Sequence, residues 1–148
     1  MSKNLLIQGL LILLSSTGFA QVYTLPNLPF EFAAYEPAVD AQTMQIHHDK
    51  HHAAYVTNLN KAITGTAMEK ISMNDLLMYA SFRSATVRNN AGGHYNHSLF
   101  WDILAPKASQ RPISKELQLA IESKYTSIDS LIATVNKAAS TRFGSGWA

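Results

Sequence analysis

The histidines of this chain fall into two short groups, and these are the residues best suited to chemistry. They are His47, His48, His51 and His52 in the first group, and His94 and His97 in the second. Residues four apart on a helix are neighbours, so the first group contains two pairs that each share a helix face. Two helices that carry imidazoles on their inner faces can hold a divalent metal between them. Because imidazole suits zinc, iron, copper and nickel alike, the spacing predicts a metal site without choosing the metal.

Other catalytic patterns are missing from the sequence. The metalloprotease motif His-Glu-x-x-His needs a glutamate after its first histidine, whereas Asp49 and Lys50 separate the histidines here. No Ser-His-Asp signature is present. Gly92 and Gly93 lie within a helical pattern and do not follow a strand, as the glycines of a phosphate-binding loop would.

Two functions without catalysis stay open at this level. In the first, a helical hairpin of the cell envelope holds zinc or copper through His47, His51 and either His97 or His94. In the second, the chain is an exported helical interaction module whose histidines are incidental. Loss of both His47 and His97 would leave the behaviour of such a module unchanged.

Two long helices must position the histidines. Asp40 is a typical N-cap for a helix over residues 41–62. The residues expected on its inner face, at helical spacing, are Met44, His47, His51, Tyr55, Leu59 and Ala62. A second helix is expected over residues 85–103, with one stripe made of Val87, Ala91, His94, Ser98 and Trp101 and a neighbouring stripe made of Gly93, His97, Phe100 and Leu104. Glycine inside a helix costs about 1 kcal/mol relative to alanine, so Gly92 and Gly93 predict the close approach of another backbone or a ligand.

Shorter elements surround these helices. Residues 22–37 are rich in proline and aromatic residues, which predicts an extended arm anchored by its rings. A short helix is expected over 73–81, a linker over 105–113, and two further helices over 114–124 and 128–142. Thr126 and Asp129 have the spacing of a capping box for the last helix, and the glycines of residues 144–146 are expected to end it.

Composition excludes several classes of function. The chain has 148 residues, 47% of them apolar, and a formal charge of +2, with no run of basic residues of the kind that a nucleic-acid surface needs. The absence of cysteine rules out disulfides and thiolate metal sites. We therefore expect a protein with a real core and no nucleic-acid partner.

Residues 1–20 have the pattern of a secretory signal peptide. Lys3 gives a charged start, Leu5 to Leu14 form a short apolar stretch, and Ala20 is the small residue that a signal peptidase requires. The stretch is too short to span about 30 Å of hydrocarbon. We expect export to the periplasm or the cell exterior, a mature chain that starts at Gln21, and no membrane span after cleavage.

Four segments in order resemble the iron/manganese superoxide dismutases. The first two are Ile46 to Asn60, with its run His-His-Asp-Lys-His-His, and Arg88 to Trp101, with its run Asn-Asn-Ala-Gly-Gly-His. The others are Leu25 to Phe30 and Thr141 to Trp147. The similarity extends over essentially all of residues 22–148.

The resemblance implies a role for each matched residue. His47 and His97 match the first and second metal ligands of the family. His51 and Tyr55 match the pair that lines the substrate funnel and relays protons. Trp101 and Trp147 match aromatic residues that wall the site. The positions that match no ligand, which we expect to be surface or outer-layer groups, are His48, His52 and His94.

The resemblance also implies a fold and a partner. We expect a mostly α chain with a helical hairpin domain over residues 21–107, followed by the first helices of a C-terminal α/β domain over 108–148. The aspartate and third histidine of the family's metal site match nothing here, so the chain is expected to be truncated, to supply half a coordination sphere and to be inactive alone. The complete protein is expected to be a homodimer that converts two superoxide ions to oxygen and hydrogen peroxide.

Gly93 bears on the choice of metal. Iron-type members of the family resemble one another in having glutamine at this position, whereas manganese-type members tend to have glycine. The resemblance therefore favours manganese over iron as the cofactor.

Overall fold

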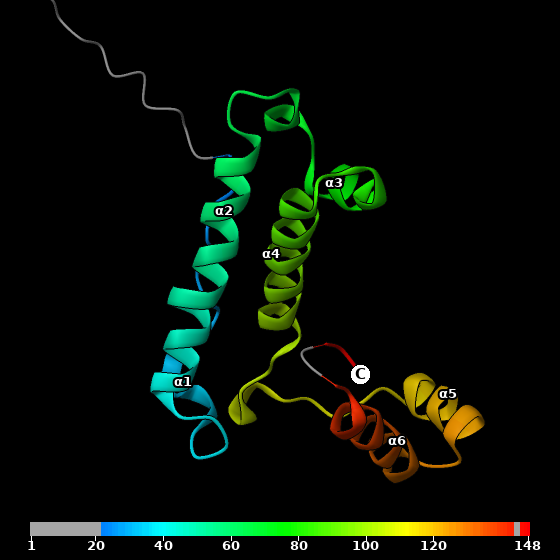
Figure 1. Ribbon diagram of the computed structural model, residues 1–148. Coiled ribbons are helices and arrows are strands. Elements are labelled where there is room, and N and C mark those ends of the chain that lie inside the picture. Colours follow the sequence, from blue (N-terminus) through cyan, green and yellow to red (C-terminus); the bar gives the residue numbers. More distant parts are fainter. Residues whose placement is uncertain (1–21, 144–145) are drawn as a thin grey trace, which may run out of the picture. The chain divides into compact units, whose positions relative to one another are not determined.

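The computed structural model describes residues 22–143 and 146–148, and all regular elements in that part of the chain are helical (Figure 1). The mostly α prediction is therefore confirmed. The predicted signal peptide and the Gly144–Ser145 part of the predicted helix stop lie outside the described residues. The chain divides into two compact units, with the boundary between Pro106 and Lys107, and each unit is described separately below.

One continuous helical segment carries the first histidine group. It consists of α1 (Ala41–Ile46), the π-helical η2 (His47–His52) and α2 (Ala53–Ile63). As predicted, Asp40 is the N-cap, and its side chain accepts hydrogen bonds from the Thr43 backbone N–H at 2.8 Å and the Thr43 hydroxyl at 2.7 Å. The segment ends at Thr64, followed by Gly65 with a φ of 74°, a left-handed conformation that glycine adopts without strain.

The buried face of this segment differs from the predicted one. The buried residues are Met44, His48, His52, Val56, Leu59, Asn60 and Ile63. Met44 and Leu59 are buried as predicted, whereas His47 and Tyr55 lie half-buried at the edge of that face and His51 is exposed. The reason is the π-helix, because its i→i+5 bonds make wider turns and keep residues at steps of four on the same face.

The second histidine group lies on α4 (Ala85–Ile103), whose bounds match the prediction. Ser84 caps it by accepting a hydrogen bond from the Val87 backbone N–H at 3.3 Å. The buried residues of α4 are Val87, Ala91, His94 and Trp101, all from the predicted stripe. In Figure 1, α2 and α4 run side by side, and their facing side chains form the core.

The core cluster consists of Leu59, Ile63, Leu76, Val87 and Ala91. Full burial of a large aliphatic side chain contributes roughly 1.5–3 kcal/mol, so these residues hold the two histidine-bearing helices together. Leu76 comes from α3 (Met73–Met78), which Ser72 caps. The connection also contains η3 (Ala67–Lys70) and η4 (Ala80–Phe82).

The N-terminal arm is tied to the hairpin by its backbone and rings. The Asn60 side chain accepts from the Tyr23 backbone N–H at 2.9 Å and donates to the Tyr23 carbonyl at 2.7 Å, while the Tyr23 hydroxyl donates to the Ile71 carbonyl at 2.7 Å. The prediction of a wholly extended arm is wrong at η1 (Phe32–Tyr35), a single 3-10 turn. That turn fits because the prolines at 29 and 37 lie outside it.

The second unit contains η5 (Lys107–Ser109), α5 (Lys115–Tyr125) and α6 (Ile128–Thr141). Ser114 caps α5 as predicted. The cap of α6 is Ser127, not Thr126, since the Ser127 hydroxyl accepts from the Ser130 N–H at 3.1 Å and Thr126 takes a left-handed φ of 73° in the turn. None of the residues of α5 or α6 is buried. Within the described part of the chain, no helix combines the length and apolarity needed to cross a bilayer.

Candidate metal centre

His47 and His97 come together from different elements of the hairpin. His47 begins η2 and His97 lies on α4, and their ring centroids are 4.8 Å apart with an interplanar angle of 77°. The His97 Nδ1 lies 2.7 Å from the Gly93 carbonyl. A carbonyl oxygen only accepts, so this Nδ1 carries the proton and Nε2 keeps its lone pair. The His97 ring is thus in the tautomer that offers Nε2 to a metal.

The electrostatics favour a neutral imidazole at His47. Burial lowers the pKa of His47 below its ordinary value, and the neighbouring His97 and His51 lower it further. A histidine binds a metal through a neutral imidazole nitrogen. His47 and His97 therefore fit two positions of an imidazole-rich metal site.

The described residues do not complete that site. Among them, no group of three or more histidine, cysteine, aspartate or glutamate side chains is arranged to hold a metal. His51 is exposed, and its ring centroid lies 6.2 Å from that of His47. Any further ligands to a metal at His47 and His97 would come from outside this part of the chain.

Tyr55 lies beside the histidine pair because Gly93 leaves room for it. The Tyr55 ring centroid is 5.2 Å from that of His97, and a Cβ atom built at Gly93 would lie 2.6 Å from Tyr55 Cγ. A close approach is therefore present at Gly93, but it is made by a side chain and not by the backbone or ligand that was predicted. It is absent at Gly92, where an added Cβ meets nothing within 4 Å.

Replacing Gly93 with alanine is expected to destabilise the hairpin by about 1–3 kcal/mol, because the new methyl group overpacks against the Tyr55 ring. Gly92→Ala is the matched control and is expected to stabilise by up to about 1 kcal/mol, since alanine favours the helix and meets no neighbour. Urea unfolding followed by circular dichroism measures both. Equal effects of the same sign would contradict the close approach.

The other three histidines, His48, His52 and His94, are buried, so of the two places expected for them, the surface or an outer layer of the site, the surface is wrong. The Trp101 indole N–H donates to His52 Nδ1 at 2.9 Å, and His52 Nε2 lies 2.7 Å from His94 Nδ1. His48 is 7% exposed, with its ring nitrogens 2.8 Å from the Pro26 carbonyl and 2.7 Å from an Asp49 carboxylate oxygen. The sequence did contain a signal for this network, because His94 and Trp101 share the predicted inner stripe.

Burial keeps the inner pair of histidines neutral. It lowers the pKa of His52 to about 3, with further lowering from the nearby His94, His97 and His48. Burial, followed by the proximity of His97, also lowers the pKa of His94. Both rings are therefore uncharged near pH 7.

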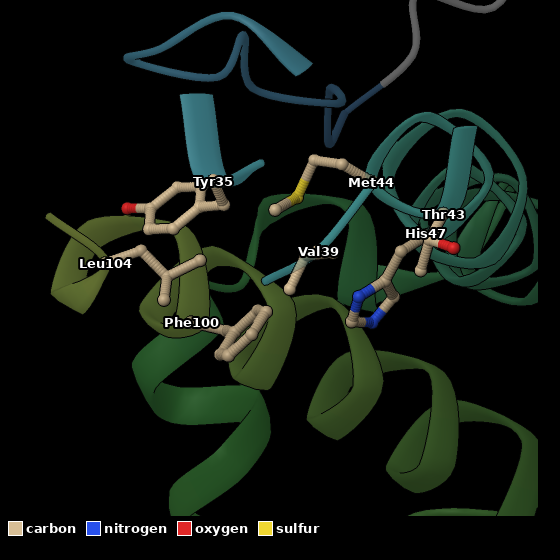
Figure 2. A pocket seen from close by; sticks show the side chains of 7 residues that line it. All are labelled: Tyr35, Val39, Thr43, Met44, His47, Phe100 and Leu104. Carbon is tan, nitrogen blue, oxygen red and sulfur yellow. The ribbon is translucent and has the colours of Figure 1, made fainter. Parts of the chain in front are cut away.

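The His47 side chain also borders a cavity of about 260 Å³ (Figure 2). The residues that line it come from the segment before α1, from α1, from the start of η2 and from the C-terminal end of α4. They are Tyr35, Val39, Thr43, Met44, His47, Phe100 and Leu104. The His47 ring centroid is 5.5 Å from that of Phe100 and 4.9 Å from that of Trp101. Of the predicted aromatic wall, Trp101 thus lies against His47, and Phe100, which was not predicted for it, adds a second ring. Trp147, the other residue predicted for it, lies in the second unit and is 48% exposed.

Comparison with known proteins identifies the family of this chain. Residues 22–105 match the family described as iron/manganese superoxide dismutases, alpha-hairpin domain. The chain is 48% identical over 130 residues to a superoxide dismutase [Fe] of Raoultella planticola, which covers 85% of this chain and 76% of the relative. It is 45% identical over 130 residues to a superoxide dismutase [Mn/Fe] of Methylomonas sp. (strain J), which covers 85% of this chain and 64% of the relative. The chain belongs to the iron/manganese superoxide dismutases, a family of metal-dependent oxidoreductases.

Proposed function

We propose that this chain supplies two metal ligands and the substrate entrance of a superoxide dismutase. The reaction consumes two superoxide ions and two protons and yields one molecule of oxygen and one of hydrogen peroxide. The observation that carries the proposal is the convergence of the His47 and His97 rings at 4.8 Å. The relatives named as superoxide dismutases support the same activity.

The residues of this chain have separate tasks in that reaction. His47 and His97 would hold the ion, which supplies one-electron redox chemistry when bound. Tyr55, beside His97, and the exposed His51 lie one helical turn apart. A phenol and an imidazole so placed can hold a proton near the site and exchange it with solvent.

For the metal we propose manganese in preference to iron. The names of the relatives allow either ion. Gly93 supports manganese, because any side chain at this position would displace Tyr55. A glutamine like that of the iron-type members would therefore not fit without a shift of the Tyr55 ring.

We also propose that the protein is exported and acts as a homodimer. Export is supported by the signal-like pattern of residues 1–20, and dimerisation by the resemblance to the family. Determination of the mature N-terminus by mass spectrometry tests cleavage after Ala20, and light scattering tests the assembly.

The decisive experiment compares the chain with a chimera. In the chimera, residues 21–148 are joined to the segment of the Raoultella planticola relative that lies outside the match. Because the described residues contain no set of three ligands, we expect the manganese-treated chain to be inactive and the chimera to dismutate superoxide. Activity of the chain alone at the level of the chimera would contradict the half-site, and an inactive, folded, metal-loaded chimera would contradict the function.

His51→Ala separates the enzyme from a zinc- or copper-binding hairpin. If His51 relays protons, the chimera should keep its manganese content and lose roughly 100-fold in activity, a typical share for a proton-transferring group. If His51 is a ligand, metal content should fall instead. Metal analysis and pulse radiolysis on the same sample distinguish the two outcomes.

A further inference from the structure

We propose that His52 and His94 are positioning residues of the metal centre. Together with Trp101 they form a hydrogen-bonded network, and this network holds in place the rings against which His47 and His97 pack. The two hydrogen bonds of this network link η2 to α4: His52 and His94 are 42 residues apart in the sequence, and His52 and Trp101 are 49 apart. Its relevance to metal binding rests on the proposed function, whereas its bonding pattern does not.

The direction of the hydrogen bonds follows from one obligate donor. An indole N–H can only donate, so His52 Nδ1 must accept from Trp101 at 2.9 Å and carries no proton. The proton of the His52 ring is then on Nε2, which donates to His94 Nδ1 at 2.7 Å. His94 in turn has its Nδ1 occupied as an acceptor, so its own proton is on Nε2. A single protonation pattern satisfies both bonds.

These bonds fix the plane of the His52 ring. They lie at its two nitrogens, so rotation of the ring about its bond to the backbone would break both. The His97 ring stacks on this fixed surface, with centroids 5.2 Å apart and an interplanar angle of 25°. The orientation of one predicted ligand is therefore defined by a ring that is itself held at both nitrogens.

The second predicted ligand, His47, packs against Trp101, at the other end of the hydrogen-bonded network. The Trp101 ring centroid lies 4.9 Å from that of His47, with an interplanar angle of 71°. Trp101 is 2% exposed, His52 fully buried and His94 9% exposed, so water competes little for these bonds. Apolar side chains of similar volume would fill the same space, but they would not fix the orientation of the His52 ring. The presence of hydrogen-bonded side chains here therefore indicates a positioning role.

The first test uses the metal-free chain and needs no activity. Long-range ¹H–¹⁵N spectra of the histidine rings should show His52 and His94 as neutral tautomers protonated at Nε2 near pH 7. The Trp101 indole proton should exchange slowly with solvent. A His52 ring protonated at Nδ1, or charged at this pH, would overturn the inference.

The second test compares two substitutions of one residue. His94→Asn places an amide oxygen within reach of His52 Nε2, whereas His94→Leu keeps similar volume and offers no acceptor. With Mn²⁺ alone as the probe, paramagnetic broadening of the His97 ring signals should require about 10- to 100-fold more metal in the leucine variant, the usual effect of losing a group that orients a ligand. The asparagine variant should remain close to the unsubstituted chain.

Contacts between rings separate this inference from the proposed function. Nuclear Overhauser contacts between the His52 and His97 rings should weaken in the leucine variant and persist in the asparagine variant, whether or not metal binds. Unchanged contacts in both variants would overturn the positioning role. If Mn²⁺ fails to broaden His97 in the unsubstituted chain, the ring contacts alone decide this inference, and the chimera decides the proposed function. If the leucine variant does not fold, the tautomers of the unsubstituted chain still decide it.

Discussion

Replacing His97 with leucine is expected to lower both the manganese content and the dismutase activity of the chimera by more than about 100-fold. Loss of a residue that merely orients a ligand already costs about 10- to 100-fold in affinity or activity, and His97 is proposed as a ligand itself. The substitution also leaves His47 as the only one of the two converging imidazoles. Metal analysis of the purified chimera and its rate of superoxide removal measure the two effects.

The control for this substitution is the neighbouring residue on the same helix. Asn96 is exposed, so Asn96→Leu changes the sequence beside the site without touching the histidine pair and should keep both manganese and activity. Full metal content in the His97→Leu chimera would show that His97 is not a ligand. Equal losses in both variants would point to general damage of α4.

Trp101→Ala is expected to destabilise the hairpin by about 3–5 kcal/mol, the range for removal of a buried large aromatic side chain. Trp101 is 2% exposed and contacts the rings of His47, His48, His52, His97 and Phe100. Its loss would remove several of the ring contacts that join η2 to α4. Urea unfolding followed by circular dichroism measures the change in the free energy of unfolding.

Two further variants divide this effect into packing and hydrogen bonding. Trp101→Phe keeps an aromatic ring but leaves His52 Nδ1 without its donor, which should cost about 1–3 kcal/mol. Phe82→Ala is the exposed control, since Phe82 is 84% exposed, and should stay within about 0.5 kcal/mol. A Trp101→Ala effect as small as that of Phe82→Ala would contradict the buried aromatic core.

Elements defined by local chemistry could be predicted from the sequence. The N-cap Asp40 was predicted because its short oxygen-bearing side chain can accept from a backbone N–H within the following turn, as it does from Thr43. The bounds of α4 were predicted from the helical spacing of the residues along 85–103. Where two candidate caps are adjacent, as at Thr126 and Ser127, local pattern does not decide, because the choice depends on the backbone conformation of the turn.

Features that depend on distant residues could not be predicted. Helical periodicity assumes a constant turn, so it placed His47, His51 and Tyr55 at the centre of the inner face, and the π-helix moved His48 and His52 there instead. The hydrogen bond of His48 to the Pro26 carbonyl joins residues 22 apart in the sequence. Neither the sequence around His48 nor that around Pro26 predicts it. The resemblance to the family identified His47 and His97 as a pair. The packing of the His97 ring on His52 could not be predicted from the sequence, because it depends on how η2 and α4 fold together.

The number of residues in the π-helical η2 determines how the histidines at its start are oriented relative to the buried residues of α2. Because η2 already holds one residue more per hydrogen-bonded ring than an α-helix does, a further residue inserted between His47 and His52 would have to turn everything beyond it by about 100°. Leu59 and Ile63, both fully buried, would then leave the core, or else the histidines would lose their partners on α4. This segment should therefore tolerate substitution at the exposed Lys50 far better than it tolerates the insertion of a residue.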